Sequence, residues 1–288
     1  MDLLVCELGS AEKGGTVAAL NGFLMKFFRL QEFTDGSSEC LFEGDFEHNL
    51  MVKFSQIKFA SFAQMRTKNF ERIFLFYEFK LPMELHAFRV LRLIRFLRKF
   101  CQDLVLIAPF MPFLREHSED FRTNSWQLLD NIPVITLDPH ILRENVFAVG
   151  SSFFESEILP EDLVILPDAG ASRYRSQYKN EFISATKDRA IGIKFSDGER
   201  IFGRNCVILD DIISSGYTLR ATVQALQKYN PANIKACVTH NLYENPDPKA
   251  WGLDSLAISD TLIVGKECNK IFDYARAFTN LRSIVDIA

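Results

Sequence analysis

Residues 206–219, with the sequence CVILDDIISSGYTL, indicate the fold class most clearly. An apolar run typical of a buried parallel strand ends at two adjacent acids, Asp210 and Asp211. A turn of small and hydroxyl-bearing residues follows, and apolar residues at helical spacing continue to residue 229. Strand, turn and helix in this order build parallel α/β sheets, whose ligands bind at the carboxyl ends of the strands.

The chemistry of this stretch fits a phosphorylated ribose. The carboxylates of Asp210 and Asp211 can accept hydrogen bonds from a cis-diol or hold a metal ion through water. The turn offers backbone N–H groups, hydroxyl groups and a helix N-terminus to a phosphate, from Ser214, Ser215, Gly216, Tyr217 and Thr218. A structural interpretation is also open, in which the acids end a strand and the hydroxyl groups cap the next helix.

Short apolar runs and helical patterns alternate along the rest of the chain. The apolar runs predict strands at 3–6, 72–76, 104–108, 134–137, 163–166, 190–193, 206–209, 234–238 and 261–264. Helical spacing predicts helices at 83–100 and 218–229. The alternation favours an α/β protein with mostly parallel sheets flanked by helices. For 288 residues we expect two domains, 1–141 and 142–288.

The composition excludes several classes of protein. Hydrophobic residues make up 48% and charged residues 24% of the chain, as in globular rather than disordered proteins. The net charge of −4, from 33 basic and 37 acidic side chains, favours neither nucleic acid nor a membrane surface as a partner. No apolar run reaches the roughly 18 residues of a membrane span, and the start MDLLVCELGS lacks the basic segment of a signal peptide. The six cysteines are scattered without a CxxC pair, so we expect reduced thiols and a cytoplasmic protein.

The pattern at 206–219 resembles the phosphoribosyl diphosphate (PRPP) motif of type I phosphoribosyltransferases and of ribose-phosphate diphosphokinases, the PRPP synthetases. Further segments resemble the synthetases in the same order, namely FTDGS at 33–37, LPMEL at 81–85, APFMPFLREH at 108–117, TLDPH at 136–140, LPDAG at 166–170, ATKDR at 185–189 and ACVTH at 236–240. The resemblance covers almost the whole chain. It implies two type I phosphoribosyltransferase-like domains, the second of which carries the PRPP motif.

The resemblance also implies a reaction. The β,γ-diphosphoryl group of ATP would move to the anomeric 1-hydroxyl of ribose 5-phosphate, giving PRPP for nucleotide biosynthesis and releasing AMP. ATP would be the co-substrate and Mg²⁺ the metal cofactor. A homo-oligomer, either a dimer or a hexamer built from dimers, is implied because the ATP site of this family is built across a subunit interface.

Individual roles follow from the matching motif positions. Lys187 and Arg189 would act in catalysis, and His140 and Asp168 would hold the metal. The positions that would bind ATP are Phe33, Asp35, Ser37, Arg115, Glu116 and His140. The positions that would bind the ribose phosphate and its diphosphate are Asp168, Ala169, Gly170, Asp210, Asp211, Ser214, Ser215, Gly216, Tyr217 and Thr218. Structural interpretations remain open for several of them, such as a solvated charged turn for Lys187 and Arg189 and a strand cap for His140.

Departures from the family pattern leave the acceptor open. Tyr217 stands where the family has glycine. The tyrosine restricts the backbone angle φ, and its ring either fills part of the phosphate site or offers a stacking face. Ser37, Glu116 and Ala171 also replace family residues. One alternative is the same transfer onto a larger ribose 5-phosphate ester such as ADP-ribose, in NAD metabolism. A second is a non-catalytic protein that regulates a synthetase, and a weaker one is a phosphoribosyltransferase.

Overall fold

The computed structural model describes residues 2–7, 10–32, 38–41, 70–80, 83–112, 114, 132–150, 154–188, 192–244, 246–262 and 270–286. It divides into two compact units. The first comprises Met1–Leu137, Leu142–Val149 and Phe278–Ala288, and the second comprises Asp138–Ile141 and Gly150–Ala277. In the part of the chain that is described, no helix is long and apolar enough to cross a bilayer.

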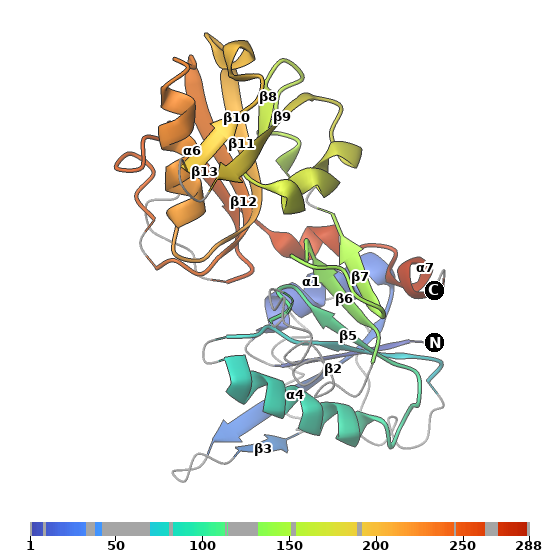
Figure 1. Cartoon of the computed structure of the whole chain (residues 1–288). Helices are drawn as coiled ribbons and strands as arrows, with labels where there is room; N and C mark the ends of the chain where they lie inside the picture. Colours follow the sequence, from blue (N-terminus) through green and yellow to red (C-terminus); the bar gives the residue numbers. More distant parts are fainter. Residues whose placement is uncertain are drawn as a thin grey trace. The chain divides into compact units, whose positions relative to one another are not determined.

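The first unit is built on a seven-stranded sheet, drawn in Figure 1. Its strands are β1 (Leu3–Glu7), β2 (Leu24–Glu32), β3 (Ser38–Leu41), β4 (Ile73–Phe76), β5 (Leu104–Ala108), β6 (Val134–Leu137) and β7 (Val146–Val149). Their order is β3-β2-β1-β4-β5-β6-β7, and the β2–β3 pair alone is antiparallel. The strands β4, β5 and β6 are buried along their whole length, as expected for strands covered on both faces.

Helices α1 (Ala11–Asn21), α4 (Met83–Leu97) and α7 (Leu281–Asp286) belong to this unit. The apolar stripe of α4, including Val90, Ile94 and Leu97, packs in one core with the alternate side chains Ile73 and Leu75 of β4. The charged side chains of α4 lie mainly on its other face, which is the pattern of a helix that covers a sheet.

The second unit contains another seven-stranded sheet. Its strands are β8 (Leu163–Leu166), β9 (Glu181–Asp188), β10 (Gly192–Phe195), β11 (Asn205–Ile213), β12 (Asn233–Asn241), β13 (Ser255–Ser259) and β14 (Lys270–Phe272). The order is β10-β9-β8-β11-β12-β13-β14, with antiparallel pairing for β9–β10 alone. The connections contain α6 (Tyr217–Gln227) and the 3₁₀ helices η3 (Ala169–Ser176), η4 (Gly198–Ile201) and η5 (Tyr274–Ala277).

The two sheets have the same topology. In each, the third strand of the unit lies at one edge, followed by the second, the first and then the fourth to the seventh. The strand β11 therefore occupies in the second sheet the place that β4 occupies in the first. The predicted α/β class with mostly parallel sheets flanked by helices is confirmed.

The division into units differs from the expected boundary between residues 141 and 142. Residues Val146–Val149 form β7, which pairs with β6 from Val134↔Val146 to Leu137↔Val149 and so extends the first sheet. The segment Phe278–Ala288 also returns to the first unit, where the Asn21 side chain bonds to backbone atoms of Phe278 and Leu281. Hydrogen bonds to distant segments therefore assign both stretches to the first unit. A single boundary in the sequence cannot separate the two units, because each is made of more than one segment.

Seven of the nine strands predicted from apolar runs are present at the predicted positions, whereas the sequence pattern predicted none of β2, β3, β7, β9 and β14. The strand predicted at 190–193 is displaced to β10 at Gly192–Phe195. The strand predicted at 261–264 is wrong for residues 261 and 262, which follow β13 (Ser255–Ser259), and residues 263 and 264 lie outside the described residues. Thr261 follows β13 in a bend, and its side chain bonds to those of His240 and Ser259. Four cysteines, Cys6, Cys101, Cys206 and Cys237, are buried free thiols, as expected.

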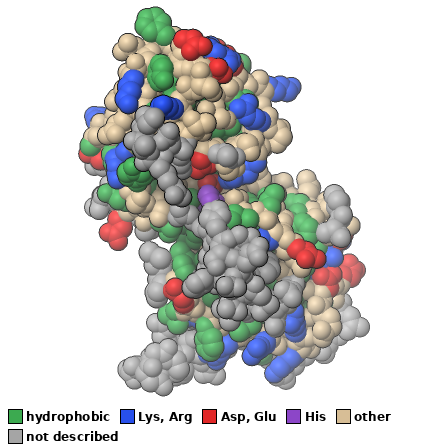
Figure 2. Space-filling model, in the orientation of Figure 1, with side chains coloured by type: hydrophobic (Ala, Val, Ile, Leu, Met, Phe, Trp, Pro, Cys, Tyr) green, Lys and Arg blue, Asp and Glu red, His purple; other side chains and the backbone are tan. Residues whose placement is uncertain are grey.

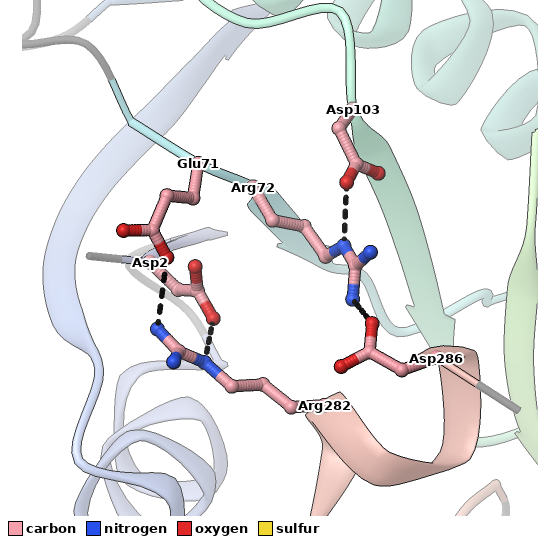
Figure 3. A pocket seen from close by; sticks show the side chains of 6 residues that line it. All are labelled: Asp2, Glu71, Arg72, Asp103, Arg282 and Asp286. Atoms are coloured by element: carbon pink, nitrogen blue, oxygen red, sulfur yellow. Dashed lines mark hydrogen bonds and ion pairs between the residues drawn. The ribbon is translucent and has the colours of Figure 1, made fainter.

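An ionic cluster links α7 to residues beside the amino-terminal ends of strands in the first sheet (Figure 3). Arg72 Nε lies 2.8 Å from Asp103 Oδ2 and Arg72 Nη1 lies 2.8 Å from Asp286 Oδ1. Arg282 pairs with Asp2 and lies 3.7 Å from Glu71. These six side chains line a cavity of about 120 Å³. Each guanidinium in it is shared between two carboxylates, so the cluster fastens α7 to the strands.

Candidate functional site

The site predicted from 206–219 is built on β11, which lies between β8 and β12 near the middle of the second sheet. Residues Cys206 to Leu209 are fully buried, and the strand continues through the two acids to Ile213. Asp210 is half-buried and Asp211 is buried. The carboxylates therefore emerge at the carboxyl end of an anchored strand.

Gly216 turns the chain from β11 into α6. Its φ is +71°, which is the left-handed region that favours glycine. A Cβ at this position would lie 2.8 Å from Arg220 Nη1 and 3.2 Å from the Trp251 ring. The position thus requires glycine both for its backbone angle and for space.

The turn presents polar groups at the start of the helix. Ser214 and Ser215 are exposed, and the Tyr217 backbone N–H donates to Ser215 Oγ at 3.3 Å. Leu219 and Val223 hold α6 in the core of the unit. The serine hydroxyls and the first N–H groups of α6 therefore lie at a fixed place at the surface, as a phosphate-binding turn requires.

Tyr217 does not occupy the turn as its sequence position suggested. It is the first residue of α6, with no positive φ, because Gly216 supplies the unusual backbone angle. Its side chain is 73% exposed. The ring is therefore open to solvent beside the turn and is not packed into the core of the unit.

The loop after β8 brings a third acid to the same edge of the sheet. β8 pairs with β11 in parallel, with Ile165 opposite Ile208. Asp168 caps η3, and its Oδ1 accepts the Ala171 backbone N–H at 3.3 Å. A Cβ on Gly170 would lie 3.2 Å from that Oδ1, so a small residue keeps this loop tight.

His140 and Arg173 bind the buried acid of the motif. His140 Nδ1 lies 2.8 Å from Asp211 Oδ2, and Arg173 Nη2 lies 3.7 Å from Asp211 Oδ1. Arg173 also donates from Nε to Asp138 Oδ1 at 3.2 Å. The sequence pattern did not identify Arg173 or Asp138, although the first follows the LPDAG loop and the second lies within TLDPH.

The electrostatics separate the two adjacent acids. Desolvation raises the pKa of Asp210 well above its usual range, and the carboxylates of Asp211 and Asp168 raise it further. Burial acts in the same direction on Asp211, but His140 and Arg173 outweigh it and lower the pKa of that carboxyl. Asp211 is thus held as a carboxylate, while charging Asp210 is unfavourable without a nearby cation or donor.

A magnesium ion is implied by the family resemblance and is compatible with these side chains. Among the described residues, no group of three or more His, Cys, Asp and Glu side chains is arranged to hold a metal by itself. Mg²⁺ bound with a nucleotide, however, takes one or two carboxylates and completes its shell with water and phosphate oxygens. A cation beside Asp210 would offset the desolvation of that carboxylate and the repulsion by Asp211 and Asp168, which together raise the pKa of Asp210.

Several predicted site residues lie outside the described residues. These are Phe33, Asp35, Ser37, Arg115, Glu116 and Arg189. Lys187 lies on β9 opposite Ile193 of β10, where a loop was expected, because the β9–β10 hairpin extends through Asp188. The structure does bring together His140, Asp168, Asp210 and Asp211, along with Ala169 and Gly170 of the η3 loop and the turn Ser214, Ser215, Gly216, Tyr217 and Thr218.

Asp168, Asp210, Asp211 and the turn before α6 lie in a region that matches a known family, whereas Asp138 and His140 precede that region. Residues 155–262 match the family model of the phosphoribosyl transferase domain. The chain is 30% identical over 192 residues to "Ribose-phosphate pyrophosphokinase 3, chloroplastic" of Arabidopsis thaliana, over 54% of this chain and 46% of that protein. It is also 30% identical over 187 residues to "Ribose-phosphate pyrophosphokinase 3, mitochondrial" of Spinacia oleracea, over 53% and 45% of the two chains. The chain thus spans about half the length of the curated relatives it matches.

The fold is shared with a solved structure. The crystal structure of phosphoribosylpyrophosphate synthetase from Mycobacterium smegmatis matches with a TM-score of 0.76 and 15% identity, over 100% of both chains. The predicted pair of phosphoribosyltransferase-type domains is thereby confirmed as the fold class.

Proposed function

We propose that this chain is a divergent member of the ribose-phosphate pyrophosphokinase (PRPP synthetase) family and that it transfers the β,γ-diphosphoryl group of ATP to the anomeric 1-hydroxyl of ribose 5-phosphate. The products are PRPP and AMP. The observation that carries the proposal is the meeting of Asp210, the Asp168 loop and the serine-rich turn before α6 at one edge of the second sheet.

In this mechanism the turn binds the 5-phosphate. The exposed hydroxyl groups of Ser214 and Ser215 and the first N–H groups of α6 hold the phosphate oxygens. Asp210 accepts hydrogen bonds from the ribose hydroxyls. These contacts fix the sugar so that its 1-hydroxyl points toward the bound nucleotide, which removes much of the entropic part of the barrier.

The chemical step is an in-line displacement at the β-phosphorus. The ribose 1-oxygen forms a bond to that phosphorus, the bond from it to the α–β bridging oxygen breaks, and the hydroxyl proton passes to water. Lys187 and Arg189 neutralise the charge that develops on the phosphoryl oxygens. Mg²⁺, held by His140 and Asp168, would neutralise further charge on the phosphates. The proposed ATP contacts remain Phe33, Asp35, Ser37, Arg115 and Glu116. In this proposal another subunit of a homo-oligomer contributes some of them, and the protein acts in the cytoplasm.

A larger acceptor such as ADP-ribose is the second candidate, and one feature beside the turn favours it. The Tyr217 ring is 73% exposed next to the proposed phosphate position. The Arg220 guanidinium lies 5.5 Å from the centre of the Trp251 ring and borders the same turn at Gly216. An exposed ring and a further cation suit an acceptor that continues past the 5-phosphate into a second phosphate and a base.

Comparative AMP release tests both candidates. The protein is incubated with ATP and Mg²⁺ and either ribose 5-phosphate, ADP-ribose or no acceptor, and AMP and the C1 diphosphate are measured by chromatography and ³¹P NMR. Acceptor-dependent AMP release supports the transfer, and the preferred acceptor decides between the candidates. If neither acceptor stimulates AMP release, the transfer is rejected and the alternative of a non-catalytic regulatory protein is favoured.

The Tyr217→Ala variant then examines the role of the ring. For ADP-ribose as acceptor, we expect a fall in kcat/KM for Tyr217→Ala and an unchanged value for Tyr229→Ala, a tyrosine beyond the other end of α6. If Tyr217→Ala and the wild-type protein have the same kcat/KM for ADP-ribose and the same kcat/KM for ribose 5-phosphate, the ring plays no part in acceptor choice.

A further inference from the structure

Asp138 is a buried carboxylate with several donors. Its side chain is 1% exposed, and its backbone has φ +42°, which is strained for a residue with a side chain. Thr239 Oγ1 donates to Asp138 Oδ2 at 2.6 Å, and the Tyr174 hydroxyl donates to the same oxygen. Arg173 Nε donates to Asp138 Oδ1 at 3.2 Å. Donors from η3 and β12 therefore fix this carboxylate.

Arg173 is held on more than one side. Besides its bond to Asp138, its Nη1 donates to the Gly170 carbonyl oxygen at 2.8 Å, and its guanidinium lies 4.7 Å from the centre of the Tyr174 ring. The guanidinium thus has little freedom to move. Its Nη2 is the atom that reaches Asp211 Oδ1, at 3.7 Å.

Both oxygens of Asp211 are therefore engaged by the protein. One faces Arg173 and the other lies 2.8 Å from His140 Nδ1. A carboxylate that is held in this way fixes the plane of the imidazole beside it, and any ligand of His140 must then use Nε2. Asp210, in contrast, is half-buried at the end of the strand.

We propose that Asp138 and Arg173 are positioning residues of the acceptor site, which fix the Asp211 carboxylate and through it the His140 imidazole. Asp210 is then the motif acid that meets the acceptor hydroxyls, and Asp211 is the one that orients His140. The inference rests on the proposed function for its catalytic consequence, but the orientation of His140 does not depend on any activity.

The first test follows the His140 imidazole directly. The protein is labelled with ¹⁵N-histidine, and long-range ¹H–¹⁵N spectra are recorded at one fixed pH without ATP, acceptor or metal. Resonances are assigned with His140→Gln. We expect one well-defined environment for His140 in the wild-type protein, with the proton on Nδ1, and an altered or averaged signal in Arg173→Met. Arg175→Met, in the same 3₁₀ helix but bonded to Ser184, is the matched control and should leave the signal unchanged.

The second test separates positioning from folding. At a temperature where each variant is fully folded by circular dichroism, we expect kcat/KM for the acceptor to fall about 10- to 100-fold in Arg173→Met and Asp138→Asn, with a much smaller change in Arg175→Met. Arg173→Lys keeps the positive charge but lacks the planar guanidinium with its several N–H donors, so it should recover part of the loss in kcat/KM. Thr239→Val, which removes one donor to Asp138, is the milder variant if the others fail to fold.

The outcomes are distinct. An unchanged His140 signal in folded Arg173→Met, or in Thr239→Val if Arg173→Met does not fold, overturns the proposal, and so does a kcat/KM for that variant within twofold of the Arg175→Met value. If the wild-type protein shows no acceptor-dependent AMP release, the proposed function fails. The His140 spectra would still decide whether Asp138 and Arg173 orient the imidazole.

Discussion

Asp211 Oδ2 lies 2.8 Å from Nδ1 of His140, a residue 71 positions earlier in the chain. This contact joins the end of β11 to the segment Asp138–Ile141, which belongs to the second unit although it follows the last residue of β6. Two motifs that look independent in the sequence, TLDPH and ILDDI, are therefore in contact through His140 and Asp211.

The Asp211 carboxylate should stabilise the fold in a pH-dependent way. Its pKa is lower in the folded chain than in the unfolded one, so the unfolded state takes up more protons as the pH falls. Its contribution is complete above the unfolded pKa of about 3.9 and is lost as the pH falls through the folded value. We expect Asp211→Asn to lower the free energy of unfolding by roughly 1–3 kcal/mol at pH 7, measured by urea denaturation. The difference from the wild-type protein should shrink in acid, and a difference that stays constant from pH 7 to the acid limit of folding would contradict this.

Asp210 should have the opposite effect. Its folded pKa is raised, so the cost of its charge is absent below the unfolded pKa of about 3.9 and grows as the pH rises toward the folded value. Asp210→Asn should therefore raise the melting temperature in EDTA, and more at pH 8 than at pH 5, while abolishing acceptor binding. A variant that melts below the wild-type protein at neutral pH would show that Asp210 is a structural residue.

Gly216→Ala should damage the turn beyond the cost of its backbone angle. An alanine at φ +71° costs roughly 1–2 kcal/mol, and its Cβ would also press on Arg220. Gly203, with φ +68° and open space around its Cβ position, provides the matched control. We expect Gly203→Ala to lose stability alone, and Gly216→Ala to lose more stability and, in titration calorimetry, affinity for ribose 5-phosphate. Equal effects of the two substitutions on both measurements would argue against a phosphate-binding turn.

Lys187→Ala should reduce turnover rather than binding. A cation that neutralises charge developing in the transition state affects kcat, and its loss typically costs about 100-fold or more. Lys194, exposed on the paired strand β10, is the control. Steady-state AMP release should show a fall in kcat for Lys187→Ala with KM nearly unchanged, and wild-type values for Lys194→Ala. A KM effect alone would reassign Lys187 to substrate binding.

Arg72 should stabilise the first unit through α7. Its side chain is 17% exposed and is shared between Asp103 and Asp286. We expect Arg72→Met to lower the free energy of unfolding by roughly 1–2 kcal/mol, with a smaller effect in 1 M salt. Arg276→Met should be close to neutral, because Arg276 is 83% exposed and 3.9 Å from Asp273. Equal stabilities of the two variants in urea would show that the cluster around α7 contributes little.

Charge on the visible surface does not single out either unit. Figure 2 shows acidic and basic side chains interspersed over the face that is drawn, in keeping with the net charge of −4.

Sequence patterns predicted the fully buried strands well and the strands that contain charged residues poorly. Strands such as β5 and β6, buried throughout, have continuous apolar runs that no other local structure explains. The strands β2 and β9 carry charged residues among their apolar ones, as in LMKFFRLQE, and gave no comparable signal. The run at 261–264 suggested a strand, but pairing with β12 selects Ser255–Ser259, where Val238 lies opposite Ile258.

Local patterns predict the order of strand, acids, turn and helix at 206–227, because each of these depends on neighbours within a few residues. The sequence leaves a second point open. It did not determine which of the two adjacent acids is held and which is left partly exposed. The tertiary structure decided that, because the partners of Asp211 come from His140 and Arg173, which only the strand order of the second sheet and the return of Asp138–Ile141 bring to it.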